Sequence, residues 1–140
     1  MPGVTASFTG RRPEIEAAEP ATLGGQLLRR RRELGHRRVD AVQSMGISWK
    51  SLMWWERNER EPLDRFWPTI ITYLGREPWS PPDSLSEQLQ AERRRRGLAR
   101  FEAAAALGVD DTTYWWWESG RREPSSARTR SLVARFLGGE

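Results

Sequence analysis

The sequence has no cysteine, and His36 is the only histidine among its 140 residues. The lack of cysteine excludes a disulfide framework, a thiol nucleophile and a cysteine-ligated zinc site. A single histidine argues against a multi-histidine metal site and a conventional histidine-based triad. No apolar run approaches the roughly 18 residues that span a bilayer, and residues 1–20 lack the apolar core of a secretory signal. We therefore expect a cytoplasmic protein with no cofactor, no metal and no membrane association.

Lysine is almost absent too, because Lys50 is the only one among 23 basic residues. With 19 acidic residues, the net charge is +4. Arginine suits bidentate or stacked contacts with phosphates and bases. A GC-rich genome would also favour arginine codons, so two explanations of the arginine content stay open. Neither explains the eight tryptophans.

The chain repeats itself at an offset of 62 positions, without gaps, from Leu23–Pro62 to Leu85–Pro124. The identical pairs are Leu23/Leu85, Gln26/Gln88, Leu27/Leu89, Arg31/Arg93, Arg32/Arg94, Gly35/Gly97, Arg38/Arg100, Ala41/Ala103, Gly46/Gly108, Trp54/Trp116, Trp55/Trp117, Glu56/Glu118, Arg60/Arg122, Glu61/Glu123 and Pro62/Pro124. So many identities indicate a tandem duplication. We call residues 21–78 the first copy and residues 84–140 the second copy.

The segments outside the two copies differ in composition from them. Residues 79–83 form a proline-rich linker, which we expect to be stiff and extended. Residues 1–20 have no apolar period, which predicts a flexible arm. Arg11 and Arg12 in this arm could reach a minor groove, as basic arms do in some DNA-binding proteins. A disordered leader without such a role is the simpler interpretation.

Apolar residues at helical spacing, interrupted by glycines, predict four short helices in each copy. The expected ranges are 23–34, 38–45, 48–56 and 65–74 in the first copy, and 85–96, 100–107, 110–118 and 127–137 in the second. Ser84 and Glu87 have the spacing of a capping box, and Ser48 and Asp110 are favoured N-cap residues. No segment alternates with the period of a strand. The sequence therefore predicts an all-α fold of two tandem small helical bundles, each with four to five helices.

Two short helices joined by a glycine turn have the pattern of a helix-turn-helix. In the first copy this pattern includes Leu23-Gly24, Arg31, Gly35, Met45-Gly46-Ile47-Ser48, Trp55-Glu56 and Glu61-Pro62. In the second copy it includes Leu89, Arg93, Gly97-Leu98, Leu107-Gly108-Val109, Trp117-Glu118, Gly120 and Pro124. Each copy resembles the phage repressor/Cro-type (XRE) helix-turn-helix family. The resemblance implies a lambda-repressor-like bundle, core tryptophans at Trp55 and Trp117, and two structural ion pairs. Those pairs are Arg31 with Glu56 and Arg93 with Glu118.

The same resemblance implies that the third helix of each copy enters a DNA major groove. The implied DNA-binding residues of the first copy are Arg37, Arg38, Ser48, Trp49, Lys50, Ser51, Trp54 and Arg57. Those of the second copy are Arg100, Asp111, Thr112, Thr113, Trp116 and Arg121. Lys50 has the chemistry to recognise guanine. Arg38 and Arg100 begin the second helix, where the family usually has a glutamine that contacts phosphate.

Charge distinguishes the two copies. Residues 23–62 hold nine basic and five acidic side chains, whereas residues 84–124 hold seven of each. The second recognition helix also begins with Asp110 and Asp111, which repel phosphate, although an aspartate can accept a hydrogen bond from cytosine. The first copy is therefore the better electrostatic candidate for DNA. The second copy could recognise only specific bases or could bind a protein.

Tryptophans and arginines beyond the ion pairs leave further alternatives. If Trp55 lies in the core, Trp54 points largely outward, because adjacent helical residues are about 100° apart. The exposed rings could pack between the copies, form a protein interface or contact nucleic acid. In the runs 29–32 and 93–96, we expect the arginines outside the ion pairs to form a solvated face with some phosphate contact.

The sequence thus predicts a sequence-specific double-stranded DNA-binding protein, a bacterial or phage transcription regulator with tandem helix-turn-helix units. The alternative is a protein-interaction or antitoxin-like adaptor on the same fold, whose second copy binds a protein partner. The possible partners besides DNA are another protein or a second copy of this chain, bound through the tryptophan-rich third helices. No glycine-rich phosphate loop, metal-ligand spacing or nucleophile–base pair is present, so an enzyme is not expected.

Overall fold

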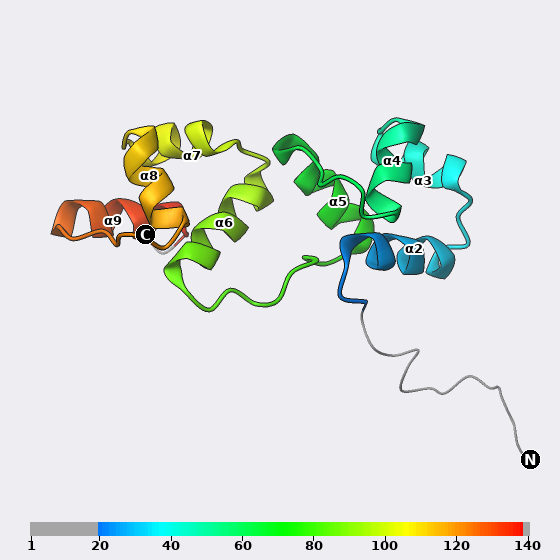
Figure 1. Cartoon of the computed structure of the whole chain (residues 1–140), viewed down its shortest axis with the longest axis horizontal. Coiled ribbons are helices and arrows are strands. Elements are labelled where there is room, and N and C mark those ends of the chain that lie inside the picture. Colours follow the sequence, from blue (N-terminus) through cyan, green and yellow to red (C-terminus); the bar gives the residue numbers. More distant parts are fainter. Residues whose placement is uncertain (1–19, 139–140) are drawn as a thin grey trace, which may run out of the picture. The chain divides into compact units, whose positions relative to one another are not determined.

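A computed structural model describes residues 20–138 of the chain, and every regular element in that range is a helix (Figure 1). The elements in order are α2 (Leu23–Glu33), α3 (Arg38–Met45), α4 (Trp49–Glu56), the 3₁₀ helix η1 (Asp64–Phe66), α5 (Trp67–Leu74), α6 (Leu85–Arg96), α7 (Arg100–Leu107), α8 (Asp111–Glu118) and α9 (Ala127–Phe136). The predicted all-α class is confirmed. The predicted arm, except for Pro20, lies outside the described residues.

Local sequence signals explain where these helices begin and end. Ser84 and Glu87 form the predicted capping box at the start of α6. The side chains of Ser48 and Asp110 accept hydrogen bonds from backbone amides in the first turns of α4 and α8. Gly97 ends α6 at a φ of 69°, a left-handed conformation that favours glycine. The largest difference from the expected ranges is at residues 64–66, which form a 3₁₀ turn so that α5 begins at Trp67 rather than at residue 65. The helices expected to end at residues 34 and 137 end one residue earlier.

Packing divides the chain into two compact units. The first unit comprises residues 20–43 and 47–60, in which α2 packs against α4. The second unit comprises residues 44–46 and 61–138, in which α6 contacts η1, α5 and α8, while α7 contacts α8 and α9. The helix α5 is thus packed with α6, which follows it across the proline-rich segment. The copies defined by the sequence repeat, with a linker at residues 79–83, stay a prediction.

Close backbone approach holds α2 against the end of α4 in the first unit. A Cβ atom added to Gly24 would lie 2.4 Å from the carbonyl oxygen of Glu56, so only glycine fits there. The Gly24 amide donates a hydrogen bond to Oδ1 of Asn58, at 2.9 Å. Ser86 occupies the corresponding position in the second copy, and its hydroxyl donates to the carbonyl of Glu118. The same helix–helix contact is therefore made by glycine in one place and by serine in the other.

The second unit has a continuous apolar core made by α6 to α9. Its buried members are Leu89, Ala103, Ala104, Leu107, Tyr114, Trp117, Val133 and Phe136. Burial of these side chains supplies the main favourable free energy of folding. No helix between residues 20 and 138 is long and apolar enough to cross a membrane.

Candidate functional site

Two pairs of short helices, each joined by a glycine turn, are the candidate recognition elements, and both pairs have the same local construction. In one, α3 and α4 are joined through Gly46, and in the other α7 and α8 are joined through Gly108. Both glycines have positive φ, 68° and 84°, which an L side chain rarely adopts. The following N-cap residues then start α4 and α8, so only three residues separate the two helices of each pair.

An ion-pair network around Glu118 fixes α8 against α6 and α7. Arg93 Nε donates to Glu118 Oε2 at 2.7 Å, and Arg100 Nε donates to Oε1 at 2.7 Å. The hydroxyl of Tyr114 donates to Oε2 at 3.0 Å. Arg93 is 3% exposed, and its Nη1 also donates to Asp64 and to the carbonyl of Leu98. Arg93 and Glu118, the ion pair that the resemblance implies, are thus both buried, and each makes hydrogen bonds with more than one partner.

Charge and burial act together on the ionisable groups of this network. Burial alone would lower the pKa of Arg93, but the ion pairs with Glu118 and Asp64 outweigh it and raise the pKa. Burial and the negative charge of Glu118 raise the pKa of Tyr114. The tyrosine therefore stays a neutral hydrogen-bond donor, and the arginine stays charged.

The first unit has a similar but more open network around Glu56. Arg31 Nε and Nη2 donate to its two carboxylate oxygens at 2.8 and 3.4 Å, and Arg38 Nε donates at 3.2 Å. Leu52 stands where the second copy has Tyr114, so no hydroxyl donor is available at that position. The Arg31 side chain is 14% exposed, compared with 3% for Arg93. The network in the second unit is therefore the better buried of the two.

Arg38 and Arg100 were expected to contact phosphate, and both instead have a carboxylate partner in the structure. Their side chains remain 43% and 59% exposed while they pair with Glu56 and Glu118. A phosphate could still approach the exposed edges of these guanidinium groups, so phosphate contact stays a prediction. The family pattern implies one arginine partner for each glutamate, Arg31 for Glu56 and Arg93 for Glu118. The second partners, Arg38 and Arg100, were therefore not predicted.

The first turn of α4 exposes a mixed polar and basic surface. Ser48, Trp49 and Lys50 are exposed, and Ser51 is half-buried. Ser48 is occupied as the N-cap, because its Oγ accepts from the Ser51 amide at 3.0 Å. Lys50 extends its ammonium group to 5.7 Å from the centre of the Trp54 ring. A cation at a helix N-terminus opposes the helix dipole, so Lys50 has little value for stability and is available for a ligand.

Two further predicted residues flank this surface on the same unit. Arg37 is exposed and pairs with Asp40 at 3.2 Å, a contact that raises the pKa of Arg37 and lowers that of Asp40. Arg57 follows the end of α4 and is exposed. Lys50 and Arg57 thus place exposed cations near the two ends of α4, the candidate recognition helix of the first unit.

The first turn of α8 is acidic and polar instead. Asp110, Asp111 and Thr112 are exposed, and Thr113 is half-buried. Asp110 caps the helix through the Thr113 amide at 2.7 Å, and this hydrogen bond lowers its pKa. The carboxylate of Asp110 is therefore committed to the helix start, where it also matches the helix dipole. Asp111 is the acidic group left to face an approaching ligand.

Arginine side chains cover two of the tryptophans that were expected to face outward. The guanidinium of Arg60 lies 4.1 Å from the ring centre of Trp54, and that of Arg122 lies 3.8 Å from the ring centre of Trp116. Both tryptophans are half-buried. The rings are thus less open than expected, and the outer surface at these positions is arginine. Sequence reasoning missed these stacks, although each tryptophan and arginine recurs at the same offset in both copies.

Two exposed aromatic residues on α7 and α8 were also missed. Phe101 is 61% exposed, and Trp115 is 38% exposed with Arg121 stacked 4.6 Å from its ring centre. Arg121 was predicted as a DNA contact but holds this ring. The first copy has Val39 and Met53 at the equivalent positions. The two candidate faces therefore differ in aromatic content as well as in charge.

Among the described residues, no group of three or more histidine or acidic side chains could hold a metal ion. The exposed groups on α4 and α8 are hydrogen-bond donors, acceptors, cations and rings. Such groups are suited to recognition of a partner surface.

Residues 84–138 match the family model of a helix-turn-helix domain. No match was found among the curated proteins or among the solved structures. The segment from α6 to α9 is therefore similar to helix-turn-helix domains.

Proposed function

We propose that this protein binds double-stranded DNA in a sequence-specific manner and regulates transcription. The observation that carries the proposal is the match of residues 84–138 to a helix-turn-helix domain. The first turn of α8, the helix that would enter the major groove, is exposed in that domain. We further propose that the domain is of phage repressor/Cro type.

The first copy is, in this proposal, a second helix-turn-helix unit produced by tandem duplication. Support comes from local geometry at equivalent positions. Glu56 and Glu118 each bind two arginines, and Trp54 and Trp116 each lie beneath an arginine at the equivalent place. The turn glycines of both motifs have the same left-handed backbone. One chain would then carry two unlike recognition helices, α4 and α8, for two unlike half-sites.

In this proposal, electrostatics assigns different tasks to the two recognition helices. Lys50 and Arg57 on the first unit would supply base and phosphate contacts. Asp111, Thr112 and Thr113 on the second unit would supply base contacts with little attraction to phosphate. Ser51, Arg37 and Arg100 would contact the phosphate backbone of the DNA and so position the protein on the duplex.

A salt titration of duplex binding tests the proposal. Each phosphate contact that releases a counterion steepens the dependence of affinity on salt. For about six or more contacts, we expect affinity for a mixed-sequence duplex to fall about 10³-fold or more between about 50 and 200 mM salt. Fluorescence anisotropy of a labelled duplex measures this directly. Weak binding that does not change with salt would contradict the proposal.

A protein-binding role for the second copy is the second candidate function. Exposed Phe101 and Trp115, together with exposed Asp111, favour it. Tryptophan is enriched among the residues that dominate protein interfaces. In this case the chain would be an antitoxin-like adaptor, and the salt titration would give the weak, salt-insensitive result.

A further inference from the structure

One arginine in the run 93–96 differs from its neighbours. Arg93 pairs with Glu118, Arg95 pairs with Glu77, and Arg96 pairs with Glu92. Arg94 has no carboxylate partner within residues 20–138, and its buried Nε has no hydrogen-bond partner there. The expectation that this arginine belongs to a solvated face is therefore wrong. An unpaired N–H in a buried position costs free energy, so its presence needs an explanation.

Aromatic rings hold the Arg94 guanidinium in place. It lies 4.7 Å from the ring centre of Trp67 and 5.6 Å from that of Trp79. The two rings meet edge to face, with centres 5.7 Å apart. Trp79 is fixed in turn, because its Nε1 donates to Glu77 Oε1 at 3.1 Å, and Glu77 is bound by Arg95. The cation is thus preorganised without being neutralised.

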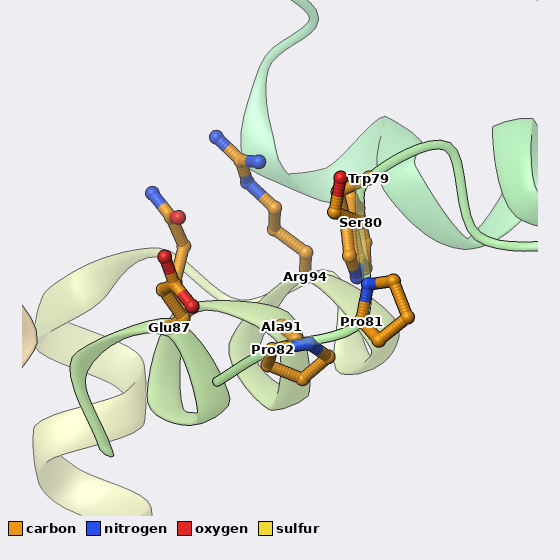
Figure 2. A pocket seen from close by; sticks show the side chains of 8 residues that line it. Trp79, Ser80, Pro81, Pro82, Glu87, Ala91 and Arg94 are labelled. Atoms are coloured by element: carbon orange, nitrogen blue, oxygen red, sulfur yellow. The ribbon is translucent and has the colours of Figure 1, made fainter. Parts of the chain in front are cut away.

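A pocket of about 170 Å³ lies beside this guanidinium, entirely within the second unit. It is lined by Trp79, Ser80, Pro81, Pro82, Glu87, Gln90, Ala91 and Arg94. Figure 2 shows Trp79 and Ser80 on one side, Glu87 on the other, and Arg94 between them above Ala91. Proline, alanine and indole surfaces make the base apolar. A cavity of about 150 Å³ can hold a benzene ring, so one ring fits here.

Charge around the pocket limits which ligand it would take. Glu87 is the acidic residue among the lining side chains, and its Oε1 already accepts from the amides of Asp83 and Ser84. Its negative charge at the pocket disfavours a ligand with two negative charges. Burial and the neighbouring Arg93 lower the pKa of Arg94 by more than the carboxylates of Glu61, Glu118 and Asp64 raise it, and a bound anion would offset the remaining effect. The Nε is closed off from solvent, whereas the terminal nitrogens are not among the buried unpaired atoms. A carboxylate in the pocket would therefore be bound by the two terminal N–H groups of the guanidinium fork.

We propose that this pocket binds a small organic acid with one ring and one carboxylate, which pairs with Arg94 while the ring lies on Pro81, Pro82 and Ala91. The site goes beyond the proposed DNA-binding function, and nothing in it depends on DNA. A bound acid would join residues 79–82 to α6, because both segments line the pocket.

Benzoate is the probe that tests this site, with benzamide as a neutral ligand of nearly the same shape. Calorimetry of the full chain should give a benzoate Kd of about 1 mM, as expected for a ligand of this size. Benzamide and inorganic phosphate should each bind at least about 10-fold more weakly than benzoate. Benzamide lacks the negative charge, and phosphate lacks the ring. In spectra of the indole ¹H–¹⁵N groups, the Trp79 signal should shift with benzoate.

Variants separate the role of Arg94 from general charge. Arg94→Gln should weaken benzoate binding about 10-fold or more, and Arg94→Lys should also weaken it, because an ammonium lacks the guanidinium fork. Arg32→Gln is the matched control, because Arg32 is the exposed counterpart of Arg94 in the first copy. It should leave the Kd unchanged. Absence of saturable benzoate binding, equal binding of benzamide, or an unchanged Kd in Arg94→Gln would each overturn the proposal.

Discussion

Replacing Arg93 with alanine is expected to destabilise the protein by about 3–5 kcal/mol, the usual loss when one partner of a buried ion pair is removed. Arg93 is 3% exposed and bonds Glu118, Asp64 and the Leu98 carbonyl. Without it, the buried Glu118 carboxylate keeps only Arg100 and Tyr114 as donors. In a domain of this size such a loss lowers Tm by at least about 12 °C.

The matched control for this variant is Arg31→Ala, which breaks the corresponding pair in the first unit. Arg31 is more exposed than Arg93 and pairs with Glu56, whereas Arg93 pairs with both Glu118 and Asp64. A smaller loss, of about 1–3 kcal/mol, is expected there because the charges are less desolvated. Thermal unfolding followed by circular dichroism measures both variants. A Tm within a few degrees of the parent for Arg93→Ala, or a larger loss for Arg31→Ala, would contradict the structural role assigned to this network.

Loss of Lys50 and Arg57 together is expected to weaken duplex binding about 10- to 100-fold and to reduce the salt slope by about 1 to 2. Both side chains are exposed at the two ends of α4. Stability should change little, because neither residue is buried. Anisotropy titrations of Lys50→Ala/Arg57→Ala at several salt concentrations measure the affinity and the slope.

A charge-matched variant shows whether position matters. Arg128→Ala/Arg135→Ala removes the same two charges from the first and last turns of α9, and both side chains are exposed. This variant should keep its duplex affinity within about threefold of the parent, since general charge alone gives only a screened, long-range effect. Equal losses in the two double variants would mean that α4 makes no specific contact. No loss in either would remove the first unit from the proposed interface.

Helix positions could be predicted from the sequence because their signals are local. Ser84 with Glu87, and the N-caps Ser48 and Asp110, mark helix starts through hydrogen bonds that span three residues. The partners of Arg31 and Arg93 followed from the family pattern, and the structure contains both pairs. Helix starts are therefore readable from short segments of sequence, and the ion-pair partners from positions that the family pattern shares.

Tertiary contacts between residues far apart in the sequence could not be predicted in this way. Arg38 and Arg100 join Glu56 and Glu118 across 18 residues, and no local pattern distinguishes that contact from one with phosphate. The placement of Trp79 over Arg94 likewise depends on how residues 75–84 fold back on α6. Composition predicted only a stiff linker there. This packing forms the pocket and buries the Nε of Arg94.

Exposure on the recognition helices was predicted in part. Trp49 is exposed as the resemblance implies, whereas Trp54 and Trp116 are half-buried beneath arginines. A helical wheel gives the direction of a side chain but not what covers it. The roles of these residues in DNA binding stay a prediction.

Selection of binding sites by the purified chain from a random-sequence duplex pool is the most direct test of the proposed function. Two unlike recognition helices on one chain predict enrichment of a site with two unlike parts at a fixed spacing. Affinity for that site should exceed affinity for the unselected pool by about 10³-fold or more. A site with only one part would assign the second copy to a protein partner. Absence of any enriched sequence would contradict the claim that this protein recognises DNA.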